Sequence, residues 1–583
     1  MSLDGNAPAA VSISERAVPQ LAEPLHANPL LHRILAARGV CDARELAFSL
    51  ADIPRPDTLP AIDLAVDRLL KARDKGERVL IVGDYDCDGA TSTAVALLGL
   101  GMLGFNDVDY LIPDRFEFGY GLSPAITDVA QREYQPRLIV TVDNGVASVD
   151  GVARAAEHGM DVVITDHHLA PAILPDAVAI VNPNLPQANF DGRNLAGVGI
   201  IFYTLLAVRA RLKRLNDPFA SAALTELLDL VAIGTIADVV PLDALNRTLV
   251  EQGLRRIRAG RTRPGVLALL KAAGKNSETI TTQDIGFGIG PRLNAAGRLD
   301  DMRIGVQCLL GDTSEVAERI AEQLNSLNSS RQSIEREMRE AAAIQMDMLS
   351  FEAESSEDSF AVCLMDESWH QGVIGILAGR IKDATFKPVV VFTLDDGDNL
   401  KGSARSIPGV HIRDVLQNIV ARHPGMVAKF GGHAMAAGLT LSRKAFEKFR
   451  QAFNDEVKDV LNGQHRERQY LTDGSLADSE RTLENATLIG SFMPWGQGFE
   501  APLFHDVFRV VQQKSVGRDQ SHLKLLLEST DTGQRIHAIA FNQPCVSNVE
   551  NHLSVVYSLD ANLFRDSYTL QLRVQYLEPC ALR

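Results

Sequence analysis

Short runs of β-branched and aliphatic residues alternate with helical patterns between residues 78 and 183. The helical patterns include STAVALLGLGMLG and GVARAAEHG, and the strand-like runs recur at intervals of roughly 20–30 residues. This alternation is typical of a parallel α/β sheet whose strands are joined by right-handed crossover helices. The predicted strands are RVLIVGD (78–84), VDYLIP (108–113), RLIVTVD (137–143), DVVITD (161–166) and VAIVNP (178–183).

Changes of pattern divide the rest of the chain, whose 583 residues are enough for several domains. The expected parts are an N-terminal helical segment at 1–50, the parallel-sheet domain at 51–311, a long connecting helix at 312–352, a second α/β domain at 353–465 and a small β-barrel at 466–583. The connecting helix would be ~50 Å long at ~1.5 Å per residue. The stretch NSLNSS (325–330) weakens its middle.

The composition indicates the cellular compartment of the protein and restricts the kinds of partner that it can bind. Six scattered cysteines without a CxxC pair suggest neither a disulfide framework nor a zinc knuckle, so we expect a cytoplasmic protein. No apolar run approaches the ~18 residues of a membrane span, so no membrane partner is expected. A net charge of −16 argues against general attraction of polyanions, so nucleic acid would have to bind in a local groove. The arginine-rich run at 246–264 is either such a contact or a solvated helix face.

Acidic residues and histidines gather where the predicted strands end. The strand ends carry Asp84, Asp86 and Asp88 in GDYDCDG, Asp143 in TVDNG, and Asp166, His167 and His168 in TDHH. Because the carboxyl ends of parallel strands meet at one edge of the sheet, we expect these residues to be neighbours. Crowded carboxylates raise one another's pKa unless divalent cations neutralise them. Carboxylates mixed with imidazole suit Mn²⁺ or Mg²⁺ better than zinc, which predicts a two-metal site for phosphoryl transfer.

Each motif also has a purely structural interpretation. DxDxDG is often a calcium loop, but an EF-hand needs Glu at its twelfth position, and that position is Val95 here. Aspartates at strand ends often only cap the next helix. Asp88 is ambiguous, since it either reaches a metal through water or caps the turn before Gly89. The occurrence of such residues on three strand ends together favours the metal site.

These motifs together resemble the DHH phosphoesterase superfamily, and within it the RecJ branch of bacterial single-strand-specific exonucleases. The resemblance spans nearly the whole chain, through GDYDCDGAT (83–91), TVDNG (141–145), ITDHH (164–168), VNPN (181–184), GTIADVVPL (234–242), PRLNAAGRL (291–299), WHQGVIGILAGR (369–380), GSARS (402–406) and FGGHAMAAG (430–438). It implies a catalytic DHH domain, a connecting helix, an α/β DHHA1 domain and a C-terminal OB-fold that binds nucleic acid, over the ranges given above.

The resemblance also implies a set of metal ligands. By motif position, one metal would be held by Asp86, Asp143, His167 and Asp238, and the other by Asp84 with Asp143 as the bridge. Asp238 is a ligand that spacing alone would not identify. DHH relatives often have a histidine four residues before the first Asp of the DxD motif. That position is Leu80 here, so one metal would have fewer protein ligands.

Further roles follow from the same resemblance. His168 would face the scissile phosphate as a transition-state stabiliser or proton donor, and Asp166 would orient an imidazole from behind the ligands. The expected substrate contacts are Arg115 in PDRFEFGYG, Arg292, Asn294 and Arg298 in PRLNAAGRL, Ser403 and Arg405 in GSARS, and Gly431, Gly432 and His433 in FGGHAMAAG. For the PRLNAAGRL residues, bonding between helices is an equally good interpretation. The aromatic residues of SFMPWGQGFEAPLF are expected to pack the linker rather than to bind bases.

The implied reaction is metal-dependent hydrolysis of single-stranded DNA from its 5′ end to 5′ mononucleotides, in DNA repair and recombination. We expect a monomer whose partners are single-stranded DNA, a single-strand-binding protein and a helicase. A passage too narrow for a duplex would give strand specificity. Two alternatives stay open. One is a DHH phosphodiesterase of short oligonucleotides or cyclic dinucleotides, although such proteins tend to be much shorter. The other is a non-catalytic single-strand-binding scaffold, in which the metal carboxylates are usually lost.

Overall fold

The computed structural model describes residues 11–352, 359–517, 520–543, 545–546, 552–564 and 567–580. Residues 1–10 of the predicted N-terminal segment and residues 353–358, at the start of the predicted second α/β domain, lie outside the described residues. The chain divides into two compact units. One consists of Glu15–Leu327 with Leu471–Arg583, and the other of Asn328–Tyr470 with Met1–Ser14.

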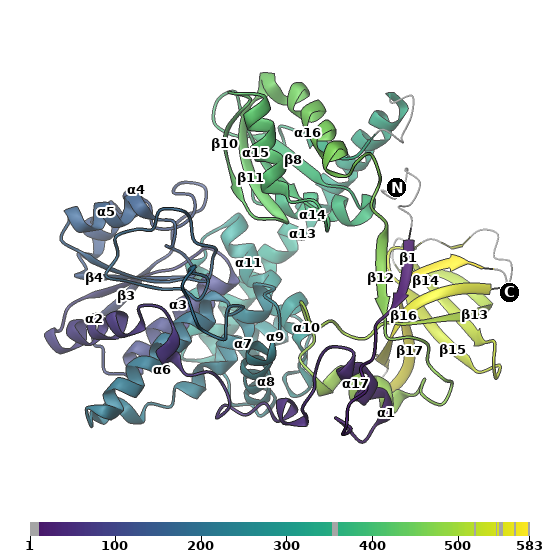
Figure 1. The fold of residues 1–583 in the computed structure, drawn as a ribbon, viewed down its shortest axis with the longest axis horizontal. Helices are drawn as coiled ribbons and strands as arrows, with labels where there is room; N and C mark the ends of the chain where they lie inside the picture. Colours follow the sequence, from purple (N-terminus) through teal and green to yellow (C-terminus); the bar gives the residue numbers. More distant parts are fainter. Residues whose placement is uncertain are drawn as a thin grey trace. The chain divides into compact units, whose positions relative to one another are not determined.

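A five-stranded parallel sheet organises the first unit, as the alternating pattern predicts (Figure 1). Its order is β3-β2-β4-β5-β6, and every neighbouring pair is parallel. The strands are β2 (Val79–Val82), β3 (Val108–Leu111), β4 (Leu138–Val142), β5 (Asp161–Thr165) and β6 (Ala179–Val181). β2 and β4 are buried along their whole length, which explains their uninterrupted aliphatic sequences.

Helices cover both faces of this sheet. They are α2 (Ile62–Lys75), α3 (Cys87–Met102) and α6 (Gly197–Arg214) on one face, and α4 (Pro124–Val129) and α5 (Val149–Glu157) on the other. Alternate residues of β2 serve the two layers: Val79 and Ile81 pack with the first set, and Leu80 and Val82 with the second. Both faces of the sheet are therefore covered by packed side chains, and the candidate functional residues lie in the loops at its carboxyl edge.

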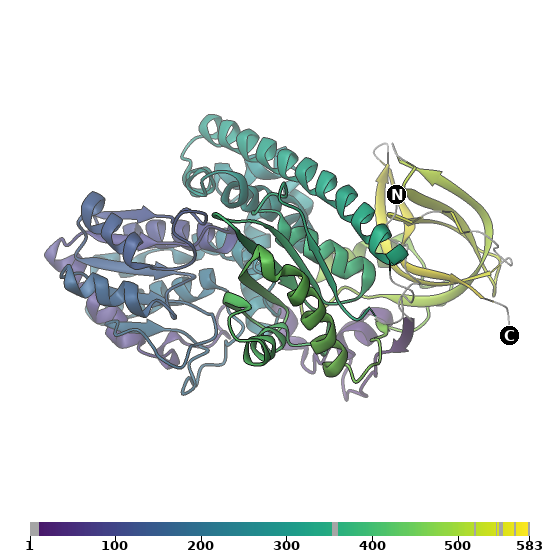
Figure 2. The ribbon, with the colours of Figure 1, turned by 90° about the horizontal axis from the view of Figure 1, so that it is seen from above.

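A helical block follows the sheet. It contains α7 (Leu228–Ala237), α8 (Ala244–Arg258), α9 (Pro264–Ala272), α10 (Thr282–Asp284), α11 (Gly290–Leu299) and α12 (Arg303–Leu310), with the π-helix η7 at Ile285–Ile289. After it, α13 (Ser314–Glu352) runs as one continuous rod (Figure 2). The predicted weak middle does not break it, because Leu324 and Asn328 are buried there and Arg331 Nη2 donates to Asn328 Oδ1 at 2.9 Å.

The second unit contains a mixed sheet in the order β10-β11-β9-β8-β7. In this sheet β7 and β8 are parallel, and the other neighbours are antiparallel. The strands are β7 (Val362–Met365), β8 (Val389–Leu394), β9 (Asn399–Arg405), β10 (Val427–Gly432) and β11 (Ala436–Ser442), and the helices are α14 (Ile374–Thr385), α15 (Ile412–Arg422) and α16 (Phe446–Val460). This confirms the predicted second α/β domain.

The C-terminal region forms a closed barrel in the order β13-β14-β15-β17-β16. The strands are β13 (Phe504–Val516), β14 (His522–Ser529), β15 (Arg535–Ala540), β16 (His552–Phe564) and β17 (Ser567–Pro579). A helix that the sequence did not predict, α17 (Leu483–Phe492), precedes the barrel. The packing role of the aromatic linker is confirmed, because Trp495 and Phe499 are buried and stack at 5.4 Å between ring centroids.

The N-terminal segment is not purely helical, which corrects the expectation for residues 1–50. It contains α1 (Pro29–Ala36), but it also contains β1 (Val11–Glu15), which pairs with β12 (Arg468–Thr472). A strand of five residues whose partner lies more than 450 positions away leaves little local signal, which is why the sequence pattern missed it.

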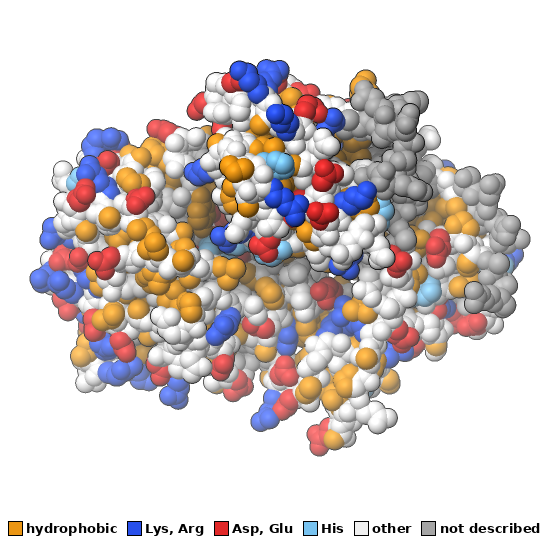
Figure 3. All heavy atoms as spheres, turned by 45° about the horizontal axis from the view of Figure 1, so that its top comes forward, with side chains coloured by type: hydrophobic (Ala, Val, Ile, Leu, Met, Phe, Trp, Pro, Cys, Tyr) orange, Lys and Arg blue, Asp and Glu red, His pale blue; other side chains and the backbone are white. Residues whose placement is uncertain are grey.

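Charged side chains of both signs are interspersed over the face that Figure 3 presents. Several arginines of the run at 246–264 form hydrogen bonds and ion pairs within the protein. Arg255 and Arg258 both bond to Glu251, and Arg263 pairs with Asp229. This supports the structural interpretation of the run. Among the described residues, no helix combines the length and the hydropathy needed to cross a bilayer.

Candidate metal centre

The strand-end aspartates and histidines meet at the carboxyl edge of the parallel sheet. Three groups of potential metal ligands each have their ligand atoms within 4.8 Å of one another. The groups are Asp84, Asp86 and Asp143; Asp143, His167 and His168; and Asp88, His167 and Asp238. Because Asp143 and His167 each belong to two groups, the three form one continuous cluster.

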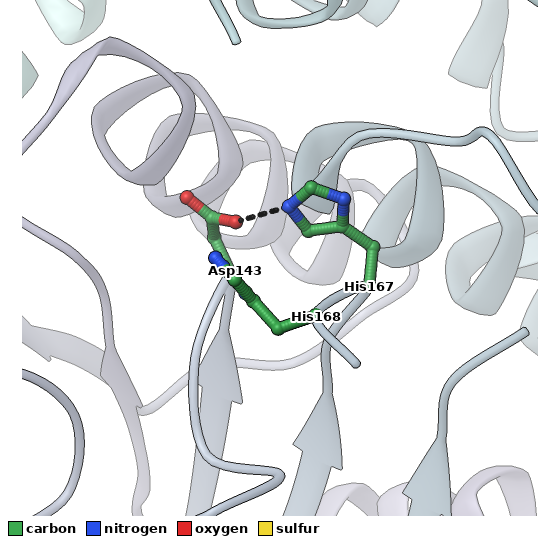
Figure 4. Close-up of side chains that lie close together, drawn as sticks. All are labelled: Asp143, His167 and His168. Atoms are coloured by element: carbon green, nitrogen blue, oxygen red, sulfur yellow. Dashed lines mark ion pairs between the residues drawn. The ribbon is translucent and has the colours of Figure 1, made fainter. Parts of the chain in front are cut away.

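His167 lies at the centre of this cluster. Its Nε2 is 3.2 Å from Asp143 Oδ1 and 3.4 Å from Asp238 Oδ2. Figure 4 shows the Asp143 carboxylate and the His167 imidazole facing each other from loops beyond two strands. Asp143 Oδ1 and Asp238 Oδ2 are buried, and neither accepts a hydrogen bond from the described residues. Buried carboxylate oxygens without a donor are costly in a protein, and beside an imidazole they form a donor set that fits Mn²⁺ or Mg²⁺.

Local backbone geometry turns Asp143 toward the cluster. Its φ is +62°, a left-handed conformation that is uncommon for residues other than glycine. Asn144 holds this turn, because its Nδ2 donates to Val82 O at 3.0 Å and to Val142 O at 2.9 Å. A Cβ on Gly197 would lie 2.5 Å from Asp143 Oδ1, so only glycine lets the carboxylate approach the start of α6.

Two helices begin at the cluster and direct their N–H groups toward it. Asp86 is the N-cap of α3 and accepts from Gly89 N at 3.0 Å. Asp88 accepts from Gly197 N at 2.7 Å and from Val198 N at 3.0 Å, so it caps α6 and not the turn before Gly89 that the sequence suggested. The positive ends of α3 and α6 thus offset part of the negative charge.

Burial and mutual repulsion disfavour the charged carboxylates in the protein without metal. Burial first, and neighbouring aspartates second, raise the pKa of Asp84, Asp143 and Asp238 well above the usual value. For the same reasons the pKa of Asp88 rises to about 7. A divalent cation removes this repulsion, so the cluster is suited to binding one.

Asp166 and His168 form a separate pair beside the ligands. Asp166 Oδ1 lies 2.7 Å from His168 Nδ1, and Asp166 also accepts from the backbone N–H groups of Val146, His167 and His168. Burial raises the pKa of Asp166, but the His168 contact and these N–H groups outweigh it and lower the pKa below its usual value. Burial would lower the pKa of His168, but Asp166 and further aspartates raise it to about 9.

The predicted substrate residues of the first unit have different surroundings. Arg115 lies over the Tyr85 ring, with its Cζ 4.6 Å from the ring centroid. Asn294 Oδ1 accepts from Cys87 N at 2.8 Å and so joins α11 to the start of α3. Arg292 donates to Asn325 Oδ1, Gly288 O and Ala272 O at 2.8–3.1 Å, which supports the structural interpretation for that arginine. Arg298 is half-buried.

The predicted phosphate contacts of the second unit form their own group. Arg405 Nη1 donates to Ser403 Oγ at 3.2 Å, and a Cβ on Gly375, in the first turn of α14, would lie 2.9 Å from Arg405 Nη2. Within the described chain Arg405 pairs with no carboxylate, and burial lowers its pKa. In the sheet register, Ser403 pairs with Gly438 and Gly438 with Gly431.

The hairpin of the FGGHAMAAG motif adds to this group. Gly432 has φ +148°, and a Cβ on it would meet Ala436 O at 2.4 Å, so this turn requires glycine. His433 N donates to Ala436 O at 2.8 Å.

Tyr120 is a site residue that the sequence reasoning missed. It lies in PDRFEFGYG, the motif that supplied Arg115, and its hydroxyl reaches both Asp143 O and His168. A tyrosine in a loop carries no signal of its own. Only its closeness to Arg115 in the sequence could have indicated it.

Family comparisons agree with this architecture. Residues 78–235 match the DHH family N-terminal domain, residues 357–459 the DHHA1 domain and residues 472–576 the RecJ OB domain.

Close relatives match over nearly their full length. The single-stranded-DNA-specific exonuclease RecJ of Haemophilus influenzae is 47% identical over 97% of this chain and 99% of its own. The RecJ exonuclease of Escherichia coli is 44% identical over 98% of this chain and 99% of its own. The crystal structure of RecJ from Thermus thermophilus in complex with Mn²⁺ covers 98% of this chain and 80% of its own, with 27% identity and a TM-score of 0.80. The chain therefore belongs to the RecJ family of DHH proteins.

Proposed function

We propose that the protein is a metal-dependent exonuclease that hydrolyses single-stranded DNA. The observation that carries this proposal is the buried cluster in which His167 Nε2 lies 3.2 Å from Asp143 Oδ1 and 3.4 Å from Asp238 Oδ2. The family supports it, because relatives 44–47% identical over nearly the whole chain are single-stranded-DNA-specific exonucleases. Structures of the Thermus thermophilus relative with Mn²⁺ and with Mg²⁺ support either ion as the cofactor.

The ligands of the proposed site divide between two ions. Asp86, Asp143, His167 and Asp238 would hold one, and Asp84 with Asp143 would hold the other; the close approach of Asp84, Asp86 and Asp143 supports this bridging role. When bound, two divalent cations supply Lewis-acid stabilisation of phosphoryl oxygens and activate water. His168 would donate a hydrogen bond to the phosphate or a proton to the leaving oxygen, since Asp166 keeps its ring protonated on Nδ1.

Recognition of a 5′ end would fall to the group around Arg405. A half-buried guanidinium that pairs with no carboxylate among the described residues, and that lies beside a serine hydroxyl and the first turn of α14, is suited to a terminal phosphate. The glycines at 431 and 438 leave the sheet surface beside Ser403 open. This supports recognition of a 5′ end and therefore cutting in the 5′→3′ direction; release of 5′ mononucleotides stays a prediction from the family resemblance.

The barrel would hold the strand away from the cut. On β14, β15 and β17, Lys524 pairs with Ile539 and Ile539 with Arg573. The guanidinium of Arg573 lies over the half-exposed ring of Phe541, 5.4 Å from its centroid, and His522 meets this ring edge-on. A cation beside an exposed aromatic ring is the usual arrangement for stacking bases over a positive track. We infer that this face of the barrel contacts DNA.

A timed digest tests the proposal. A long single strand labelled at its 5′ end is incubated with the purified protein and Mn²⁺, Mg²⁺ or EDTA, beside a matching duplex. We expect release of labelled mononucleotide from the single strand with either ion and none with EDTA. If the long strand survives while dinucleotides supplied in a parallel digest are cleaved, the protein is the oligonucleotide phosphodiesterase. Retention of the strand in a gel shift without release would indicate the binding scaffold.

Roles in DNA repair and recombination, a cytoplasmic location, a monomeric state and partners such as a single-strand-binding protein and a helicase stay predictions from the family resemblance. The domain ranges at 1–50, 51–311, 312–352, 353–465 and 466–583 are likewise proposed. The matched family regions at 78–235, 357–459 and 472–576 support the ranges 51–311, 353–465 and 466–583, respectively.

A further inference from the structure

The hydroxyl of Tyr120 reaches into the metal centre although its ring is exposed. Tyr120 Oη lies 3.1 Å from the backbone oxygen of Asp143, and 3.2 and 3.3 Å from Nδ1 and Nε2 of His168. The ring meets His168 edge-on at 5.6 Å and Tyr85 edge-on at 6.3 Å, while 47% of the residue is exposed. The phenol therefore contacts the backbone of one proposed ligand and the ring of the proposed proton donor.

The directions of these hydrogen bonds follow from the chemistry of a phenol. Tyr120 has one hydroxyl proton, and the Asp143 carbonyl can only accept, so this proton goes to Asp143 O. Toward His168 the hydroxyl then offers only its oxygen lone pairs. Asp166 Oδ1 already accepts from His168 Nδ1 at 2.7 Å, and the phenol oxygen lies almost equally far from Nδ1 and Nε2, at 3.2 and 3.3 Å. An oxygen placed between the two nitrogens packs against the ring and leaves the Nε2 proton for the phosphate.

We propose that Tyr120 is a positioning residue that, opposite Asp166, fixes the orientation of the His168 ring for the reaction. Asp166 holds one edge of the imidazole through Nδ1, and the phenol oxygen lies against the ring between its two nitrogens, where it resists tilting of the ring away from Asp166. A second contact from Tyr120 ties the ring to the loop after β4, which also carries Asp143. One phenol thus contacts both the ring of His168 and the backbone of Asp143. This inference rests on the proposed nuclease activity and names a residue that serves it.

The test is a double-mutant cycle between Tyr120→Phe and His168→Ala. Tyr120→Phe keeps the ring and removes only the hydroxyl. We expect it to lower kcat on single-stranded DNA about 10–100-fold, with KM changed less than about 2-fold, since supporting contacts of this kind have effects of that size. In the His168→Ala background the same change should lower kcat less than about 2-fold, because the ring to be oriented is gone.

Readouts other than activity separate positioning from folding. The melting temperature, the Mn²⁺ affinity and the binding of DNA in Ca²⁺ should equal those of the wild type. A crystal structure of Tyr120→Phe should show the His168 ring displaced from its place beside Asp166. Tyr134→Phe is the matched control and should keep full kcat, because the backbone oxygen of Tyr134 accepts from Arg78, just before β2 and at the opposite end of that strand from the cluster.

The outcomes distinguish this inference from the proposed function. Equal losses in both backgrounds, or no loss in the wild-type background, would overturn the role of Tyr120 while leaving the nuclease intact. A wild-type protein that releases no nucleotide would instead refute the proposed function. In that case an unmoved His168 ring in the Tyr120→Phe crystal structure would still contradict the positioning role.

Discussion

The imidazole Nε2 of His167 lies 3.2 Å from Oδ1 of Asp143, and this contact joins the loop after β5 to the loop after β4. Asp238 reaches the same nitrogen from the end of α7, 3.4 Å away. Groups from three separate segments thus converge on one point, although neither carboxylate oxygen accepts a hydrogen bond from the described residues. Convergence of this kind is what a shared cation would stabilise.

Removal of the Asp143 charge should abolish nuclease activity without unfolding the protein. Asp143→Asn preserves the side-chain volume but leaves a weaker ligand between the two metals, so we expect the rate to fall more than about 100-fold, the upper range for supporting residues. Release of labelled nucleotide in Mn²⁺ measures this. Asp176→Asn, an exposed substitution, should keep the wild-type rate. A variant of Asp143 that retains a tenth of the activity would contradict its bridging role.

The stability of the metal-free protein should fall as the pH rises. The pKa values of Asp84, Asp143 and Asp238 are raised above the ordinary 3.8, so above that pH the folded state binds more protons than the unfolded state. The free energy of unfolding then decreases with pH, and the pKa of about 7 at Asp88 extends this window toward neutrality. We expect the melting temperature in EDTA to fall between about pH 4 and pH 7 more steeply than for Asp143→Asn.

Saturating Mn²⁺ should remove most of this slope, because the cation favours the charged carboxylates of the folded state. Parallel curves for the wild type and Asp143→Asn in EDTA would show that the cluster does not titrate as described.

Loss of Asp88 should weaken both the fold and the site. Its carboxylate accepts the first N–H groups of α6, so Asp88→Ala should lower the free energy of unfolding by about 1–2 kcal/mol, as for other caps. It should also weaken Mn²⁺ binding, since Asp88 lies within 4.8 Å of His167 and Asp238. Denaturant titration and calorimetry measure the two effects. Asp243→Ala removes the cap of α8 and should affect stability alone.

Arg405 should determine the preference for a 5′ phosphate. Charge-assisted hydrogen bonds contribute about 1.5–3 kcal/mol, so Arg405→Gln should raise KM for 5′-phosphorylated strands about 10–100-fold. Strands that begin with a 5′ hydroxyl should be cut by the variant and by the wild type at similar rates. Arg413→Gln, an exposed arginine on α15, serves as the control. An equal loss on both substrates would assign Arg405 to folding or general DNA binding instead.

The sequence predicted those features of the molecule that local sequence patterns determine. The aliphatic runs at β2 and β4 alternate with helical patterns, which predicts the strands of a parallel sheet. Because strand-end residues of such a sheet share an edge, the meeting of Asp84, Asp143 and His167 followed from the pattern. Asp238 came from the family resemblance alone, because it ends a helix and no periodicity marks it.

Features that depend on distant partners were missed. β1 exists because β12 pairs with it, and Asp88 caps a helix that starts more than 100 residues later. The sequence left Arg292 open between a phosphate contact and a bond between helices, because a sequence does not show which arginines already have protein acceptors. Its three acceptors support the second interpretation. The orientation of the Tyr120 hydroxyl depends in the same way on how its loop is packed.

Anomalous diffraction at the manganese edge from crystals grown with Mn²⁺ tests the central claim most directly. We predict one peak within bonding distance of Asp86, Asp143, His167 and Asp238, and a second between Asp84 and Asp143. No peak at the carboxyl edge of the sheet, or a peak that neither Asp143 nor His167 contacts, would contradict it.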